Sequence, residues 1–153
     1  MLAINIAYTA PINPAGASPV LTPAQVWDGL VHKVHHAEKF VPIITACEVT
    51  DKSDDGSTIT RRVTFQAGAG PMRGDTVTEV CKLFAPCRVD FEQEDGTTIG
   101  NYVSEGADGE LYMTYVFQWK AEGVEEGSEQ AAALKERYRK VSCGLYPGDI
   151  VVY

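Results

Sequence analysis

The chain has 153 residues, of which 44% are hydrophobic and 22% charged, and its formal net charge is −8 at pH 7. This length and composition are typical of one globular domain with a sizeable core, so we expect a single domain over residues 1–153. No stretch approaches the roughly 18 apolar residues of a membrane span, and the first ten residues lack a basic leader. We therefore expect a cytoplasmic protein without membrane insertion, and the acidic charge argues against nucleic acid as a partner.

Four cysteines, at positions 47, 81, 87 and 143, lie in apolar stretches and form no C-x-x-C pair. Zinc-ribbon and redox motifs need closer spacing than this. Without a secretory signal, a disulfide framework is not expected either. The sequence therefore predicts free thiols that behave as small core residues.

The N-terminal third predicts one strand followed by two short helices. Residues 2–9 alternate apolar and polar side chains with the period of a half-buried strand. Thr22 and Gln25 have the spacing of a capping box, which begins a helix that runs to about His35. A second helical turn is expected at residues 37–40.

The rest of the chain predicts six strands separated by Gly-containing turns, and then a long helix over residues 128–143. That helix carries an apolar stripe with spacings of three and four residues. We therefore predict an α+β fold, in which a curved seven-stranded antiparallel sheet wraps around the C-terminal helix and encloses an apolar cavity. The six strands are expected at 43–51, 57–66, 75–84, 87–94, 98–105 and 109–119.

Short motifs along almost the whole chain resemble the START/Bet v 1-like superfamily (SRPBCC proteins, the helix-grip fold), and within it the AtaL-like branch. The resemblance implies an internal cavity that binds a hydrophobic small molecule, because members bind lipids, hormones, polyketides or alkaloid intermediates. Some members are cofactor-free cyclases, dehydratases or synthases, and AtaL-like proteins occur in fungal secondary-metabolite clusters. The branch supplies no catalytic motif to transfer. The segments that carry the resemblance are 21–27, 40–42, 47–49, 91–93, 95–96, 101–104 and 109–112.

Hairpin geometry predicts which side chains of the last strands face the cavity. A two-residue turn at 95–96 places Val89 opposite Tyr102, and a four-residue loop at 106–109 places Tyr102 opposite Met113. The resulting face is apolar and aromatic with a few hydroxyls, which suits a small-molecule pocket. It holds Cys87, Val89, Phe91, Tyr102, Ser104, Leu111, Met113, Tyr115, Phe117 and Trp119.

Arg61 and Glu79 are charged residues on otherwise apolar strand faces. An isolated buried charge costs several kcal/mol, so each must be paired or lie near water. If both point inward, the pair lines the cavity and orients a polar ligand group; alternatively, they lie at the sheet edge or only pair with each other. A one-residue slip across Ala85-Pro86 would exchange Glu79 for Lys82.

Tyr102 completes the candidate catalytic set of Arg61, Glu79 and Tyr102, because a tyrosine can donate a hydrogen bond or a proton to a carbonyl. Tyr115 could act in the same way. The alternative for both tyrosines is a role as core aromatics whose hydroxyls reach backbone or water.

The three histidines are clustered at positions 32, 35 and 36, but they do not predict a metal site. Lys33 stands where the H-E-x-x-H motif has its glutamate, and no fourth histidine exists. His32 remains a candidate at the pocket mouth. Arg73 in the glycine-rich 67–74 segment could close over a ligand, or it is a solvated loop residue. The full set of expected ligand-binding residues is His32, Phe40, Arg73, Phe91, Ser104, Met113, Tyr115, Phe117, Leu134 and Tyr138.

Two functions fit these residues. The first is a cofactor-independent tailoring enzyme of the cyclase, isomerase or dehydratase type, acting on a hydrophobic secondary-metabolite intermediate. The alternative is a non-catalytic carrier of a hydrophobic small molecule. Polar groups that converge inside the pocket would favour the enzyme, and a fully apolar interior would favour the carrier. A homodimer, and a subunit that docks through the tail at 146–153, are further expectations.

Overall fold

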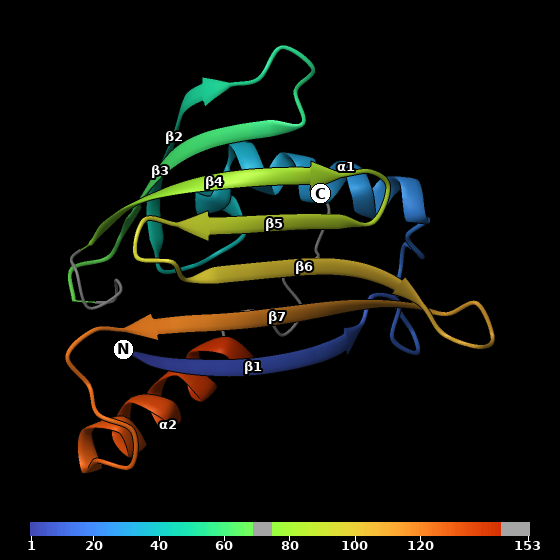
Figure 1. The fold of residues 1–153 in the computed structure, drawn as a ribbon. Helices are drawn as coiled ribbons and strands as arrows, with labels where there is room; N and C mark the ends of the chain where they lie inside the picture. Colours follow the sequence, from blue (N-terminus) through green and yellow to red (C-terminus); the bar gives the residue numbers. More distant parts are fainter. Residues whose placement is uncertain (69–74, 145–153) are drawn as a thin grey trace.

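The computed structural model describes residues 1–68 and 75–144, which form a seven-stranded sheet and three helices (Figure 1). All neighbouring strands are antiparallel, and their order is β1-β7-β6-β5-β4-β3-β2. The strands are β1 (Leu2–Pro11), β2 (Ile44–Lys52), β3 (Thr58–Phe65), β4 (Thr76–Phe84), β5 (Arg88–Gln93), β6 (Thr98–Glu105) and β7 (Leu111–Ala121). The helices are α1 (Pro23–His35), the 3-10 helix η1 (Ala37–Lys39) and α2 (Glu129–Gly144).

The predicted fold class is confirmed, since a curved antiparallel sheet carries two helices after its first strand and one helix after its last. None of the described helices combines the length and apolarity that a bilayer crossing requires. The C-terminal tail from residue 145 and the segment 69–74, which contains Arg73, lie outside the described residues.

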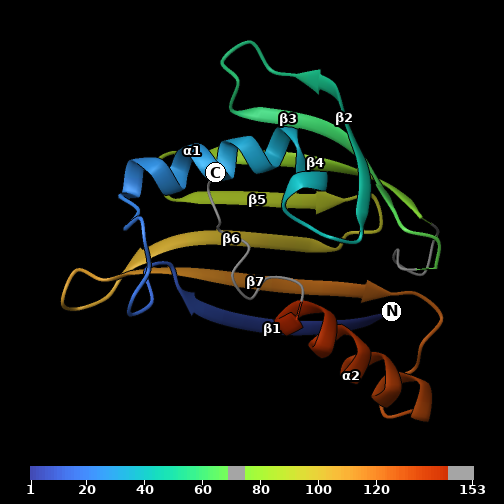
Figure 2. The same ribbon diagram turned by 180° about the vertical axis from the view of Figure 1, so that it is seen from behind.

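Helix α1 begins at the predicted capping box. The hydroxyl of Thr22 accepts a bond from the Gln25 backbone N–H, and the Gln25 side chain accepts one from the Thr22 N–H. These two bonds satisfy donors that a helix N-terminus otherwise leaves free. The buried face of α1 packs on the concave side of the sheet (Figure 2), so its residues point toward β3–β6.

The sheet bends most at β2, which turns away from the plane of the other strands (Figure 1). The β2–β3 register shifts twice, between Ile44 and Ala46 and between Val49 and Asp51. Each irregularity places an extra residue on one strand, which bends that strand and increases its twist. This bend closes one side of the concave face around α1 and η1.

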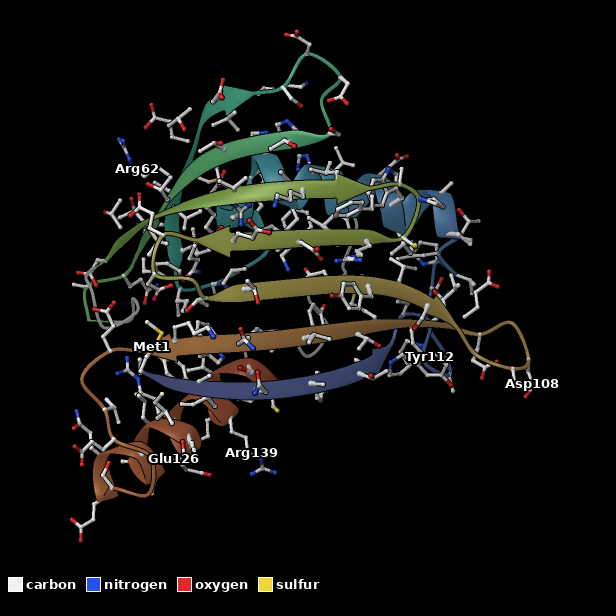
Figure 3. All side chains as sticks on the ribbon, viewed as in Figure 1. Met1, Arg62, Asp108, Tyr112, Glu126 and Arg139 are labelled. Atoms are coloured by element: carbon white, nitrogen blue, oxygen red, sulfur yellow. The ribbon has the colours of Figure 1, made fainter. Side chains whose placement is uncertain are left out.

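Apart from a third cluster that joins η1 to β2, β3 and β4, two apolar clusters occupy the concave face of the sheet. The larger lies between α1 and β3–β7, and the smaller lies where α2 contacts β1 and β7. Ile6 and Trp119 are only half-buried and pack against both clusters. By contrast, charged side chains such as Arg62, Glu126 and Arg139 project outward (Figure 3), so apolar residues concentrate on the concave side.

The predicted register of β6 was wrong by one residue on both sides. The β5–β6 loop has three residues, since the Gln93 N–H donates to the Thr97 carbonyl at 2.9 Å and Gly96 has a φ of +84°. The β6–β7 loop also has three residues, because the Gly106 N–H bonds the Glu110 carbonyl. A slip of one residue moves every side chain to the opposite face. Asn101, and not Tyr102, therefore lies between Val89 and Tyr115 on the concave face.

The predictions that depended on this register were wrong for Tyr102 and Ser104. Tyr102 lies beside Thr114 and Arg88 on the convex face, and Ser104 is exposed opposite Tyr112. Tyr102 and Arg88 line a hollow of about 330 Å³ on that face. The members of the predicted face on β5 and β7 are confirmed as buried or half-buried: Val89, Phe91, Leu111, Met113, Tyr115, Phe117 and Trp119.

The four cysteines are free thiols, as predicted, but they are not all in the core. Cys81 is buried, and Cys47 and Cys143 are half-buried. Cys87 is exposed, because it lies in the turn before β5, where its N–H donates to the Phe84 carbonyl. The prediction that Cys87 lies on the concave face was wrong.

Candidate functional site

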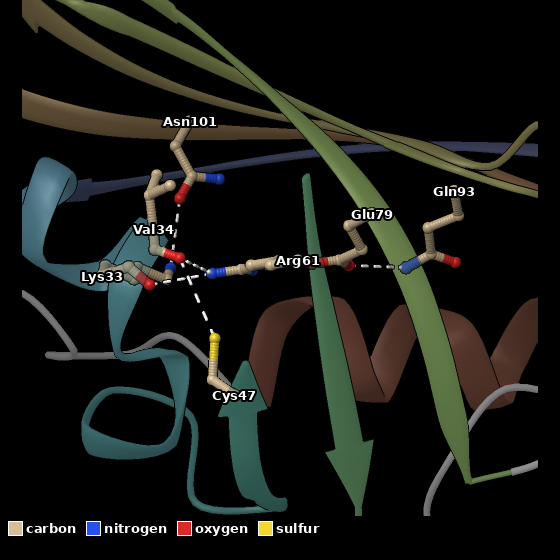
Figure 4. A network of polar contacts seen from close by, with 7 residues as sticks. All are labelled: Lys33, Val34, Cys47, Arg61, Glu79, Gln93 and Asn101. Carbon is tan, nitrogen blue, oxygen red and sulfur yellow. Dashed lines mark hydrogen bonds and ion pairs between the residues drawn. The ribbon is translucent and has the colours of Figure 1, made fainter. Parts of the chain in front are cut away.

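A buried ion pair joins two neighbouring strands beneath α1 (Figure 4). Arg61 on β3 lies directly opposite Glu79 on β4, and each residue is only 4% exposed. Arg61 Nη2 and Nε donate to Glu79 Oε2 at 2.7 and 2.9 Å. This pairing settles the ambiguity across Ala85-Pro86: Glu79 points inward, and Lys82 pairs with Glu92 on the outer face.

The same arginine also holds the C-terminal end of α1. Arg61 Nη1 donates to the backbone carbonyls of Lys33 at 2.8 Å and Val34 at 2.9 Å. The last carbonyls of a helix have no partner within it, so the guanidinium satisfies two groups that would otherwise be buried unpaired. Burial lowers the pKa of Arg61, but the net effect of its surroundings, chiefly the attraction and hydrogen bonds of Glu79, raises it, so the guanidinium stays charged.

Both carboxylate oxygens of Glu79 have hydrogen-bond partners. Its second oxygen, Oε1, accepts a bond of 3.0 Å from Nε2 of Gln93, which lies opposite it on β5. The ring of Phe91 lies 4.9 Å from the guanidinium carbon of Arg61, close enough for a cation–π contact. Three adjacent strands and a helix thus meet at one pair of charges, whose polar atoms all have partners. Such a pair positions the surrounding elements.

A second polar contact lies farther along the concave face. Lys33 Nζ donates to Asn101 Oδ1 at 3.1 Å and lies 5.6 Å from the centre of the Tyr115 ring. Lys33 is 6% exposed and Asn101 is 1% exposed, so this contact is inside the protein. The other amide atom, Asn101 Nδ2, is buried and has no hydrogen-bond partner. The polar groups of both contacts converge within an apolar, aromatic region.

Sequence reasoning missed Lys33, Gln93 and Asn101. A signal for Lys33 was present, because it lies three residues after Leu30 and seven after Val26, on the same face of the helix. Asn101 was missed because the predicted register of β6 was wrong by one residue. No sequence pattern indicates that Gln93 donates a hydrogen bond to Glu79 on β4.

The aromatic residues predicted to bind a ligand divide between the two clusters. Phe91, Met113, Tyr115 and Phe117 are buried in the larger cluster, and Leu134 and Tyr138 in the smaller one. Tyr138 stacks on Trp119 with ring centres 4.6 Å apart, and Trp119 Nε1 donates to Ser142 Oγ. Burial raises the pKa of Tyr138, so its phenol stays protonated at neutral pH.

His32 and Phe40 contact each other at the C-terminal end of α1. Their ring centres are 5.6 Å apart, and the ring of His36 is 4.9 Å from that of His32. His32 is exposed and Phe40 half-buried. Within residues 1–68 and 75–144, no three His, Cys, Asp or Glu side chains are grouped as metal ligands would be.

Cys81 lies on the same face as the ion pair but has no nucleophilic character. Burial raises the pKa of its thiol to about 12, above the ordinary value of 9.0, although Arg61 opposes the effect. The thiolate is the reactive form, so a thiol that stays protonated at neutral pH is inert.

Solved structures with the same fold come from several kinds of protein. An aromatase/cyclase from Streptomyces sp. R1128 matches with a TM-score of 0.58 and 14% identity, over 92% of this chain and 88% of that one. The protein Ara h 8.0201 matches with a TM-score of 0.54 and 14% identity, over 91% and 92% of the two chains. The di-domain aromatase/cyclase BexL gives a TM-score of 0.65 with 16% identity over 91% of this chain, which spans 45% of BexL. At these identities the matches show a shared fold alone.

The sequence comparison is more specific. Acetylaranotin biosynthesis cluster protein L of Aspergillus terreus (strain NIH 2624 / FGSC A1156) is 27% identical over 141 residues, which cover 92% of this chain and 81% of that protein. The family model described as AtaL, acetylaranotin biosynthesis cluster protein L, matches residues 6–151. The chain therefore belongs to the AtaL family.

Proposed function

We propose that this protein is a tailoring enzyme of secondary metabolism that binds a hydrophobic intermediate against the concave face of its sheet. The reaction is a cyclisation, isomerisation or dehydration, and it needs no cofactor. The observation that carries the proposal is the convergence of Lys33, Arg61, Glu79 and Asn101 inside an otherwise apolar, aromatic region. A protein that only shields an apolar compound has no need to bury charges there, because each buried charge has a desolvation cost.

Two comparisons support this role. A relative in the same family is named for a biosynthesis cluster, and two proteins with the same fold are aromatase/cyclases, one of them from the BE-7585A biosynthetic pathway. Enzymes of this kind can work by holding one reactive conformer and stabilising the charge that develops on it. In this chain the Arg61–Glu79 pair acts as a positioning element, because it fixes the end of α1 that carries Lys33.

The ligand is expected to lie between the two apolar clusters, beside the half-buried residues Ile6 and Trp119. This region lies between α1 and α2 on the concave side (Figure 2). The internal cavity and the roles of Arg61 and Glu79 remain predictions that the following experiment tests.

The test uses an organic extract from a culture in which the gene for this protein has been deleted, so that its substrate accumulates. The protein is dialysed against EDTA, incubated with the extract and analysed by liquid chromatography and mass spectrometry. We expect one apolar compound to be replaced by an isomer or by a product that has lost one water. Arg61→Lys keeps the positive charge, but a lysine cannot bond the two α1 carbonyls and Glu79 at the same time, so this variant should have a lower kcat. The matched control is Arg62→Lys on the outer face of the sheet.

The second candidate, a carrier, is favoured by one observation: all the hydrogen-bonding nitrogens of Arg61 and both oxygens of Glu79 already have protein partners. A carrier would retain a compound from the same extract and release it unchanged. That outcome, with no product after prolonged incubation, would contradict the enzyme and support the carrier.

A further inference from the structure

The amide nitrogen of Asn101 is an unusual atom in this fold. Asn101 is 1% exposed, and its Nδ2 has no hydrogen-bond partner. Native proteins pair the large majority of their buried polar atoms, because a buried donor without an acceptor loses its bonds to water and gains nothing. An unpaired donor at this depth is therefore a candidate binding point for a ligand.

The orientation of this amide is fixed by its neighbour. Lys33 Nζ donates a hydrogen bond to Asn101 Oδ1 at 3.1 Å. Turning the amide over would bring two donors face to face, so the NH₂ group must be the one that points away from Lys33.

The position of Asn101 in the sheet determines which groups its amide nitrogen can contact. Its cross-strand neighbours on the concave face are Val89 on β5 and Tyr115 on β7, and Tyr115 in turn lies opposite Tyr8 on β1. Val89 and Tyr115 are buried, whereas Tyr8 is half-buried. This row leads from Lys33 and α1 toward the region of β1 between the two apolar clusters, where the ligand is proposed to lie.

We propose that Asn101 Nδ2 donates a hydrogen bond to a carbonyl oxygen of the ligand. The inference rests on the proposed function and names its substrate class, a ring-bearing ketone or quinone with few other polar groups. Such a ligand matches both the donor and its apolar surroundings. A donor held in place in an apolar site also stabilises negative charge on such an oxygen.

The test compares two compounds that differ only in the carbonyl, 9-fluorenone and fluorene. Asn101→Asp keeps the shape of the side chain and the oxygen that accepts from Lys33, but it replaces the donor with an acceptor. We expect this variant to bind 9-fluorenone about five- to tenfold more weakly, which is the usual effect of losing one neutral hydrogen bond. Its affinity for fluorene should change by less than about twofold, since that compound has no acceptor.

A second measurement on the unaltered protein does not depend on how well the variant folds. The Asn101 side-chain NH₂ signal is assigned in a proton–nitrogen spectrum by residue-selective labelling, and each compound is then titrated in. The inference predicts that 9-fluorenone shifts this signal downfield and that fluorene leaves it nearly unchanged.

The outcomes separate this inference from the proposed function. If both compounds bind but the Asn101 signal responds equally to each, the apolar site stands and the hydrogen bond is refuted. If neither compound binds, the proposed ligand face fails and the inference fails with it. A signal that moves only with 9-fluorenone supports both.

Discussion

The guanidinium of Arg61 and the carboxylate of Glu79 lie 2.7 Å apart on neighbouring strands, with only about one twentieth of each side chain exposed. Removing one partner of such a pair leaves the other charge buried without compensation, which typically costs about 3–5 kcal/mol. We therefore expect Glu79→Gln to lower the free energy of unfolding by about this amount, measured by urea denaturation followed by circular dichroism.

The matched control is Glu92→Gln. Glu92 pairs with Lys82 on the next strand at a similar distance of 2.8 Å, but both side chains are close to half exposed. Exposed pairs contribute about 0–1 kcal/mol, so this variant should change little. Equal effects of the two substitutions would contradict a special role for the buried pair.

The stacked rings of Trp119 and Tyr138 fasten α2 to β7, because they are nearly parallel, with 7° between their planes. Tyr138→Ala should cost about 3–5 kcal/mol of stability, as other large aromatic truncations in cores do. In a Trp27→Phe background, the emission of Trp119 should also shift to longer wavelength. Arg137→Ala, one residue away on the exposed side of α2, should leave both readouts unchanged.

The thiols differ in accessibility, which predicts the order in which they react. Cys87 is exposed, whereas Cys81 is buried with its pKa raised to about 12. Iodoacetamide at pH 8, followed by digestion and mass spectrometry, should therefore modify Cys87 in the folded protein and Cys81 only after denaturation. Modification of Cys81 at a rate similar to that of Cys87 would show that the β4 core opens readily.

The β2–β3 turn should hold an unusually acidic carboxyl. The pKa of Asp55 is lowered to about 2 from 3.8, because its Oδ1 accepts from the Ser57 N–H, the Ser57 hydroxyl and the Ser53 hydroxyl. A pKa that is lower in the folded state contributes stability above pH 3.8, which is lost as the pH falls through 2. Carbon-detected NMR of the carboxyl group should show this midpoint, and Ser57→Ala should raise it; a midpoint near 3.8 would contradict the turn geometry.

The fold could be predicted from the sequence because local signals and chain order agreed. Alternation along the strands, the capping box of Thr22 and Gln25 and the positions of the glycines located every described helix and strand to within two residues. The Arg61–Glu79 pair was also accessible, since two charges on apolar strand faces need each other. The hydrogen bonds from Arg61 to the backbone carbonyls of α1 could not be predicted, because no local sequence pattern shows where a helix packs on a sheet.

The face of β6 could not be predicted from turn residues alone. The two flanking loops differ from the expected lengths by one residue in opposite directions, so the two predicted registers agreed with each other although both were wrong. Each loop ends in a glycine with positive φ, Gly96 or Gly109, which is typical of a three-residue loop with a bulge. The error exchanged Tyr102 for Asn101 and so concealed the unpaired amide.

The central claim is that a hydrophobic small molecule binds on the concave face beside Ile6. Its most direct test is native mass spectrometry of the protein after incubation with the extract from the deletion culture. We compare it with Ile6→Trp, which fills the concave side, and Ala7→Trp, which places the same side chain on the exposed convex side. The account predicts a bound small molecule on the unaltered protein and on Ala7→Trp, and none on Ile6→Trp. Equal binding by all three, or by none, would contradict it.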